Sequence, residues 1–257
     1  MTRRAPERRA KSRLDQLLVD RGLAPTRTRA QALILSGSVL VEGRRSAKAG
    51  TLVSADAHVS VAQADHPYVS RGGVKLAGAL DAFGVDPKGL SCLDVGASTG
   101  GFSDCLLQRG AARVVAVDVG YGQLAHKLRL DPRVVVLERT NARTLDVALI
   151  GGAAVDLTVV DASFIGLEKL AGALARCTRP GGALVALVKP QFEVGREVAA
   201  RGKGVVRDEQ VRGLAVDAAA ASVASAGFEV CGRCDSVLPG PKGNREAFVF
   251  ARRTGAA

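Results

Sequence analysis

The sequence contains no tryptophan, one methionine and only 4% aromatic residues. A protein that stacks RNA bases on an aromatic sheet needs several exposed rings, so this composition argues against that mode of recognition. No apolar run approaches the roughly 18 residues that a membrane span requires, and the N-terminus lacks the apolar core of a signal peptide. We therefore expect a cytoplasmic protein that makes no membrane contact.

Residues for metal binding and histidine chemistry are also scarce. The five cysteines are an odd set in mostly apolar surroundings, which is typical of reduced thiols. Cys231 and Cys234 have C-x-x-C spacing, but no second pair and no nearby histidine complete a zinc site. The three histidines adjoin no motif. We expect neither a metal site nor a histidine-based mechanism.

Positive charge, in contrast, is abundant. Lysine and arginine number 36 against 25 acidic residues, which leaves a net charge of +11. The first 65 residues hold 12 basic and 6 acidic residues, so about half of the excess lies in a quarter of the chain. A bias of this size indicates a polyanionic partner, most simply a nucleic acid.

The chain of 257 residues is long enough for one α/β domain and a small additional module. Residues 1–12 form a basic tail that we expect to be disordered. Residues 13–64 indicate a small α+β domain: 13–23 and 27–37 have helical apolar spacing, and strands follow at 39–45 and 58–64 with a turn at Glu42-Gly43. Residues 65–70, which include Tyr68, are the predicted linker.

Residues 71–253 alternate between helical and strand patterns. Helices are predicted within 69–84 and near 101–110, 121–130, 165–177 and 207–226, and the strands between them are rich in β-branched residues. Such alternation is typical of a parallel sheet that is covered on both faces. The connection LPGPKGNR between the last two strands is too short for a crossover helix, so these strands should pair antiparallel. The glycine- and arginine-rich segment 193–208 has no periodicity, and either a mobile flap or an ordinary loop would explain it.

The decapeptide LDVGASTGGF, residues 93–102, joins the first predicted strand to a helix through a glycine-rich turn. Its spacing fits neither the dinucleotide-binding nor the phosphate-binding glycine motif. It resembles the first motif of S-adenosylmethionine-dependent methyltransferases. Asp118 ends the next strand, where a carboxylate can bind the two hydroxyls of a ribose. The alternative is that the glycines serve packing alone.

Three charged residues should meet at the edge of the sheet where ligands bind in α/β folds. Asp161 and Lys189 each follow a strand, and Glu246 opens the final reversed strand. They are either a catalytic group, with Lys189 between two acids, or ion pairs that cap the sheet edge. Lys75 lies off the apolar face of its helix, so the pattern alone predicts an exposed side chain.

The segment from Arg13 to Arg45 resembles the S4 RNA-binding domain, in which basic side chains of the second helix and the following turn face RNA. The resemblance implies RNA-binding roles for five basic residues, which an ordinary charged surface could also explain: Arg27, Arg29, Arg44, Arg45 and Lys48.

The motifs VSRGGVKL, GASTGGF, DVGYGQLA, RVVVLERTNAR, LVKPQFEVG and LPGPKGN, in this order, resemble the TlyA family. The methyltransferase domain of that family is similar to FtsJ-type ribose 2′-O-methyltransferases, so the resemblance implies a Rossmann-like α/β sheet with one reversed C-terminal strand. It implies a catalytic tetrad of Lys75, Asp161, Lys189 and Glu246. It also implies S-adenosylmethionine as cofactor, bound by Gly96, Ser98, Gly100, Gly101, Phe102, Asp118 and Asn141.

The implied reaction is methylation of cytidine 2′-hydroxyls in 16S and 23S ribosomal RNA. No [DN]PP[YF] motif follows the fourth strand, which disfavours methylation of a base amine, and no Pro-Cys nucleophile is present. A charged Lys189 would orient the hydroxyl and stabilise the developing alkoxide; a neutral Lys189 acting as general base is the alternative. The alternative functions are a non-catalytic ribosome-binding factor and a haemolysin, a label that this family also carries. The family's linker usually carries an aromatic residue in a short basic motif, whereas here DHPYVSRG has Tyr68 without the basic residue.

Overall fold

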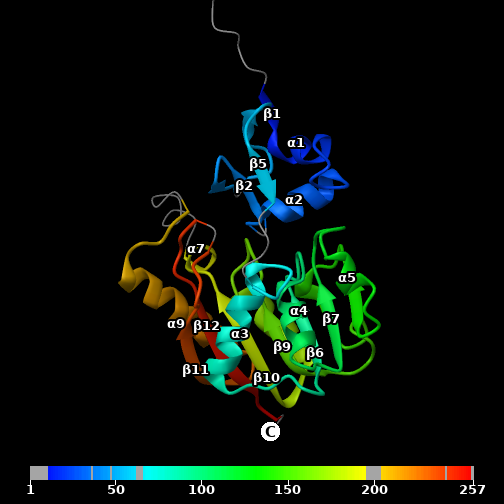
Figure 1. The fold of residues 1–257 in the computed structure, drawn as a ribbon. Helices are drawn as coiled ribbons and strands as arrows, with labels where there is room; N and C mark the ends of the chain where they lie inside the picture. The colour runs from blue at the N-terminus through cyan, green and yellow to red at the C-terminus, as the bar shows by residue number, and fades with distance from the viewer. Residues whose placement is uncertain are drawn as a thin grey trace, which may run out of the picture. The chain divides into compact units, whose positions relative to one another are not determined.

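The computed structural model describes residues 11–35, 37–46, 48–61, 66–194, 204–240 and 242–255. The chain divides into two compact units, Met1–Pro67 and Tyr68–Ala257 (Figure 1). Among the described residues, no helix combines the length and the hydropathy that crossing a bilayer would require. Each unit is built around its own hydrophobic core.

The described residues of the smaller unit form two short helices and two small sheets. Its elements are β1 (Lys11–Arg13), α1 (Leu14–Asp20), α2 (Arg27–Leu35), β2 (Val39–Val41), β3 (Arg44–Arg45), β4 (Leu52–Ser54) and β5 (Val59–Val61). β1 pairs with β4, and β2 lies between β3 and β5, all antiparallel. The core consists mainly of leucine and valine side chains from both helices and the strands.

The hairpin of this unit turns at Glu42 and Gly43, as the sequence predicts. Both residues have positive φ, +48° and +74°, which is the conformation that a tight two-residue hairpin turn requires. Lys11 and Ser12, which the sequence places in the basic tail, pair with β4 instead. The rest of the predicted tail and residues 62–65 lie outside the described residues.

The larger unit is organised around one seven-stranded sheet with the order β11-β12-β10-β9-β6-β7-β8. Its strands are β6 (Ser91–Val95), β7 (Arg113–Val117), β8 (Val134–Leu137), β9 (Val155–Val160), β10 (Thr178–Val188), β11 (Phe228–Asp235) and β12 (Ala247–Arg253). β12 is antiparallel to both of its neighbours, whereas β10, β9, β6, β7 and β8 pair in parallel. The predicted Rossmann-like sheet with one reversed C-terminal strand is confirmed.

Helices cover both faces of this sheet. α3 (Arg71–Phe83), α4 (Gly101–Gln108) and α5 (His126–Arg129) contribute to the core on one face, and α3 and α4 lie in front of the sheet in Figure 1. α6 (Glu168–Cys177) and α9 (Glu209–Ser225) contribute to the core on the other face. Two short segments, η1 (Ala142–Thr144) and α7 (Pro190–Glu193), follow β8 and β10.

Two boundaries differ from the sequence pattern. The predicted helix 121–130 is helical only over α5, because Gly122 has φ +71° and donates its N–H to the Glu138 side chain, and Ala125 donates to the Thr99 carbonyl. The positive φ of Gly122 and the contact of Ala125 both interrupt the helical pattern. Tyr68, predicted in the linker, packs against the core of the larger unit. Residues 195–203 of the predicted flap lie outside the described residues.

Candidate active site

Three strand ends meet at one edge of the seven-stranded sheet. β9 and β10 are parallel, so Asp161 and Lys189 both follow the carboxyl ends of their strands. β12 runs in the opposite direction, and its first residue, Ala247, pairs with Val188 at the end of β10. Glu246 therefore lies at the same edge, as the sequence predicts.

Lys189 and Asp161 form the first ion pair of the site. The Lys189 Nζ lies 2.6 Å from Asp161 Oδ1, and it also donates hydrogen bonds to Ser163 Oγ (2.8 Å) and to the Asp161 carbonyl oxygen (3.3 Å). The Lys189 side chain is 11% exposed and that of Asp161 is 26% exposed. The Asp161 N–H donates to the Val95 carbonyl of β6, which anchors the acid to the sheet. The ammonium group is therefore held in place at an edge that solvent partly reaches.

Lys75 and Glu246 form the second ion pair, with 2.5 Å between Lys75 Nζ and Glu246 Oε2. The prediction that Lys75 is exposed is wrong, because only 9% of its side chain and 1% of the Glu246 side chain reach solvent. The reason is that α3 is covered on a second side by the segment after β11. A Cβ on Gly78 of α3 would lie 2.7 Å from a methyl group of Val237, and a Cβ on Gly240 would lie 2.4 Å from Glu246 Oε1.

The two ion pairs lie on neighbouring segments. Gly72 precedes Lys75 by almost one turn of α3, and a Cβ on Gly72 would lie 3.7 Å from Asp161 Oδ2. The sequence predicts a single lysine between two acids. The structure instead gives each lysine its own acid: Asp161 pairs with Lys189, and Glu246 pairs with Lys75.

The glycine-rich bend after β6 lies directly beside this group. Gly96 has φ +87°, and a Cβ there would lie 2.8 Å from the Asp161 carbonyl oxygen. A Cβ on Gly101 would lie 2.2 Å from Ser70 Oγ, just before α3. These two glycines allow the bend to approach both segments that carry the ion pairs. A molecule bound at the bend would therefore lie next to Asp161.

Two further predicted cofactor residues of the bend, Gly100 and Phe102, serve packing. Gly100 has φ +93°, and a Cβ there would lie 2.2 Å from Leu128 Cδ1. The Phe102 side chain is buried in the core, where its ring stacks on Phe248 with 6.2 Å between centroids. Phe102 can therefore face a ligand at the bend only through its backbone.

Asp118 holds the opposite side of the bend through its carboxylate. Its Oδ2 accepts the N–H of Ser98 (2.8 Å), and its Oδ1 accepts the N–H of Gly120 (2.6 Å). Ser98 has φ +49°, and its hydroxyl donates to Gln123 Oε1 (3.2 Å), a contact that sequence reasoning missed. Asp118 is only partly buried, and each carboxylate oxygen keeps lone pairs for further donors. This geometry suits two adjacent hydroxyl groups.

Asn141 lies close to Asp118 along the sheet edge. The preceding residue, Thr140, donates its N–H to the Asp118 carbonyl oxygen (3.0 Å). The Asn141 Oδ1 accepts the N–H of Arg143 and caps η1, and the residue is exposed. The role of Asn141 in binding an adenine edge stays a prediction.

Asp94 is a buried carboxyl group beneath the bend. It is 0% exposed, and its Oδ2 accepts hydrogen bonds from the N–H (2.9 Å) and the hydroxyl (2.6 Å) of Ser103. Burial, with a smaller contribution from the nearby Asp161 carboxylate, raises the pKa of Asp94 to about 7 against the opposing effect of the Ser103 hydrogen bonds. The group thus changes its charge near neutral pH.

We expect Asp94→Asn to stabilise the protein at pH 8 by roughly 2 kcal/mol, and this gain to shrink as the pH falls toward 4. A carboxyl whose pKa is higher in the folded than in the unfolded chain stabilises the fold at low pH. That stability is lost as the pH rises from about 3.8 to about 7. Thermal unfolding of both proteins between pH 5 and 8 measures the effect, and parallel curves would contradict it.

Two aromatic residues at the edge were not singled out by the sequence. Phe164 follows Ser163, has φ +67° and is 89% exposed, and its ring centroid lies 5.0 Å from that of Phe192 in α7. A non-glycine residue in the left-handed region is uncommon and is typical of functional loops. The available signal was an aromatic residue three positions after Asp161 in a chain with few aromatics.

In the smaller unit, all five predicted RNA-binding side chains belong to exposed residues: Arg27, Arg29, Arg44, Arg45 and Lys48. The Arg27 Nε donates to Asp15 Oδ2 (3.0 Å), while half of its side chain remains exposed. The fully buried Asp15 also accepts bonds from Arg13 and Gln31. The Arg13 guanidinium holds the pKa of Asp15 well below its usual range, so this anchor stays charged.

Comparison with known proteins agrees with this geometry. Residues 68–253 match the model of the FtsJ-like methyltransferases, and residues 12–59 match that of the S4 domain. The chain belongs to the FtsJ-like methyltransferase family. The predicted resemblance to the TlyA family is confirmed as well, because this methyltransferase shares both domains and most of its length with a relative of that name.

That relative, the 16S/23S rRNA (cytidine-2′-O)-methyltransferase TlyA of Mycobacterium tuberculosis, is 51% identical over 94% of this methyltransferase and 90% of its own chain. Hemolysin A of Brachyspira hyodysenteriae is 39% identical over 91% and 97% of the two chains. A solved structure from Streptococcus thermophilus that also carries the hemolysin name is 37% identical, with a TM-score of 0.75 over 96% and 90% of the chains.

Proposed function

We propose that this FtsJ-like methyltransferase transfers a methyl group from S-adenosylmethionine to the 2′-hydroxyl of cytidine in 16S and 23S ribosomal RNA. The observation that carries the proposal is the position of two lysine–carboxylate pairs beside the glycine-rich bend. The name of the relative from Mycobacterium tuberculosis supports the choice of RNA and of hydroxyl.

The residues around the bend fit the proposed cofactor. The Asp118 carboxylate would accept hydrogen bonds from the two ribose hydroxyls, since both oxygens keep free lone pairs. Asn141, next to Asp118, would donate its amide N–H groups to the adenine edge. When bound, S-adenosylmethionine supplies an electrophilic methyl group.

The two lysines would have different roles in the reaction, because their ion pairs lie in different places. Lys189 lies beside Asp161, which solvent partly reaches, so its ammonium would exchange the Ser163 bond for the substrate 2′-hydroxyl, orient it and stabilise the developing alkoxide. The hydroxyl proton would leave to the solvent at this edge. The contacts of the Lys189 Nζ favour this role over that of a neutral base, because all three are made to oxygen atoms that accept: Ser163 Oγ, the Asp161 carbonyl oxygen and Asp161 Oδ1. Lys75 and Glu246 are buried, and their ion pair would hold α3 in place beside the site.

Two features would bind the RNA itself. The exposed arginines and lysine of the S4 domain would contact phosphates, which is consistent with the net charge of +11. The exposed Phe164 ring, one residue after the Ser163 hydroxyl that Lys189 contacts, offers a surface on which a base near the reacting ribose can stack.

We expect the purified protein with S-adenosylmethionine to add 2′-O-methyl groups to cytidines of ribosomal particles from cells that lack this gene. Mapping of 2′-O-methylated positions in both rRNAs, with and without the protein, measures the result. Naked rRNA, separate subunits and whole ribosomes should each be offered. Binding of the cofactor without methylation of any of these substrates would contradict the proposal and favour a non-catalytic ribosome-binding factor.

A further inference from the structure

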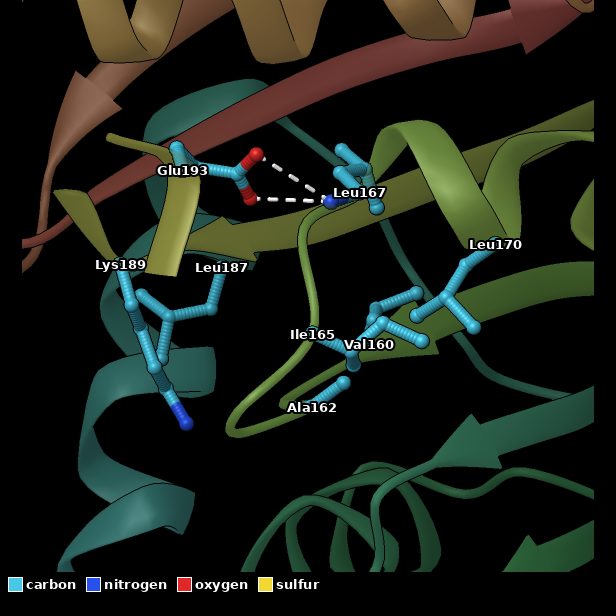
Figure 2. A pocket seen from close by; sticks show the side chains of 8 residues that line it. All are labelled: Val160, Ala162, Ile165, Leu167, Leu170, Leu187, Lys189 and Glu193. Carbon is cyan, nitrogen blue, oxygen red and sulfur yellow. Dashed lines mark hydrogen bonds between the residues drawn. The ribbon is translucent and has the colours of Figure 1, made fainter. Parts of the chain in front are cut away.

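The carboxylate of Glu193 links the two segments that carry the first ion pair. Glu193 is the last residue of α7, and its Oε1 and Oε2 accept the N–H of Leu167 at 3.0 and 3.2 Å (Figure 2). Most of the side chain is buried, and this burial raises the pKa of Glu193. A carboxylate in such a place is costly unless its hydrogen bonds are satisfied. The hydrogen bond from the Leu167 N–H therefore stabilises the buried Glu193 carboxylate.

Each end of this contact is close in sequence to a residue of the site. α7 begins directly after Lys189, and the Phe192 N–H donates to the Lys189 carbonyl oxygen (2.9 Å). Leu167 ends the loop that starts at Asp161 and carries the hydroxyl of Ser163. The Glu193 side chain thus links the loop that follows Asp161 to the turn that follows Lys189.

Two further contacts hold the same two segments together. The rings of Phe164 and Phe192 lie 5.0 Å apart. A Cβ on Gly166 would lie 3.0 Å from Glu193 Oε2 and 3.5 Å from the Phe192 carbonyl oxygen, so the loop passes close to both of these α7 residues. The loop after β9 and the turn after β10 are therefore packed as one unit at the edge of the sheet.

Glu193 does not act on the reacting atoms itself. Lys189 and Glu193 both line the small cavity between the two segments, together with six apolar residues, but Figure 2 shows that the Lys189 side chain runs away from the Glu193 carboxylate. The Lys189 Nζ is engaged instead by Asp161 and Ser163.

We propose that Glu193 is a positioning residue that holds the loop after β9 against the turn after β10 and so sets the distance between Lys189 and Asp161. The inference rests on the proposed function for its activity readout. The competing explanation is that Glu193 only caps the start of α6, where a carboxylate near the first N–H groups stabilises any helix.

The test compares Glu193→Ala and Glu193→Gln with Glu168→Ala, which removes an exposed carboxylate from the first turn of the same helix. For Glu193→Ala we expect kcat to fall roughly 10- to 100-fold, since a displacement of about 1 Å can cost that much. The dissociation constant for S-adenosylmethionine should stay within about twofold of wild type, because the Asp118 side of the bend is untouched. Glu193→Gln should restore most of kcat, because its amide oxygen can accept the Leu167 N–H.

A helix cap alone would lower the melting temperature of Glu193→Ala without changing kcat of the folded protein, and that result would overturn the proposal. A crystal structure of Glu193→Ala gives a readout that does not need turnover: the Lys189 Nζ–Asp161 Oδ1 distance should increase from 2.6 Å to beyond hydrogen-bond reach. An unchanged distance would also overturn it. If the wild-type protein methylates no RNA, the proposed function fails, and this distance still decides whether Glu193 positions the pair.

Discussion

Replacing Lys189 by alanine is expected to lower kcat for methyl transfer roughly 10²- to 10⁴-fold. The substitution removes the ammonium group that lies at the strand edge between the Asp161 carboxylate and the Ser163 hydroxyl. Without it, neither the orientation of the substrate hydroxyl nor the stabilisation of the developing alkoxide remains. Single-turnover transfer of a radiolabelled methyl group to ribosomal RNA measures the loss.

The same variant should keep its fold and its affinity for S-adenosylmethionine. The proposed cofactor residues lie in the bend after β6, at Asp118 and at Asn141, and the hydrogen bonds that hold them do not involve the Lys189 side chain. Lys169→Ala, which removes an exposed lysine of α6, is the matched control and should behave as wild type. A Lys189→Ala protein that keeps more than about a tenth of wild-type kcat would show that the lysine does not act on the hydroxyl.

Removing one member of the Lys75–Glu246 pair is expected to destabilise the protein by roughly 3–5 kcal/mol. Both side chains are almost fully buried, so Lys75→Met leaves the Glu246 charge without its partner, and Glu246→Met does the converse. The ion pair offsets the free-energy cost of removing each charge from water. When one partner is removed, the remaining buried charge still has this cost but no longer has the ion pair.

The double variant, with methionine at both positions, should be more stable than either single variant and within about 1 kcal/mol of wild type, because no buried charge is left. Its methyl transfer should still be strongly reduced, since the pair supports the site. Urea unfolding of the four proteins gives the coupling energy as a double-mutant cycle. Additive losses in the double variant would mean that the two side chains do not interact in solution.

The contrast between the two pairs explains why they should respond differently. The two lysines are about equally buried, but the side chain of Asp161 is 26% exposed and that of Glu246 is 1% exposed. Removing Lys189 therefore leaves an acid that water partly reaches, which costs less stability than leaving a fully buried one. Lys75 and Glu246 are covered by the segment that carries Val237 and Gly240, and they depend on each other. Substitutions in the first pair should therefore affect turnover more than stability, and those in the second pair should affect both.

Much of the site could be predicted from the order of strands along the chain. Because ligands bind at the carboxyl ends of parallel strands, the positions of Asp161 and Lys189 after two such strands implied one shared edge. The short connection before Glu246 implied a reversed strand, which returned this acid to the same edge. These inferences need only local periodicity and connection length, and both can be read directly from a sequence.

Other features depend on contacts that no local pattern contains. Helical spacing showed which face of 71–83 is apolar, but not that a second segment, 160 residues later, covers Lys75. The same holds for the N-terminal part of the predicted helix 121–130. It is not helical because its residues bond to Thr99 and Glu138, which follow other strands of the sheet.

By itself, the sequence determined the two-domain organisation, the sheet with one reversed strand, and the edge at which the charged residues gather, because alternating patterns and short connections limit how strands can be arranged. Only the tertiary structure decided which lysine pairs with which acid, that three of the glycines are required by contacts inside the protein, and that Glu193 joins the two loops of the site. Those decisions depend on distances of a few ångströms between segments far apart in the chain, where close packing rather than periodicity determines the outcome.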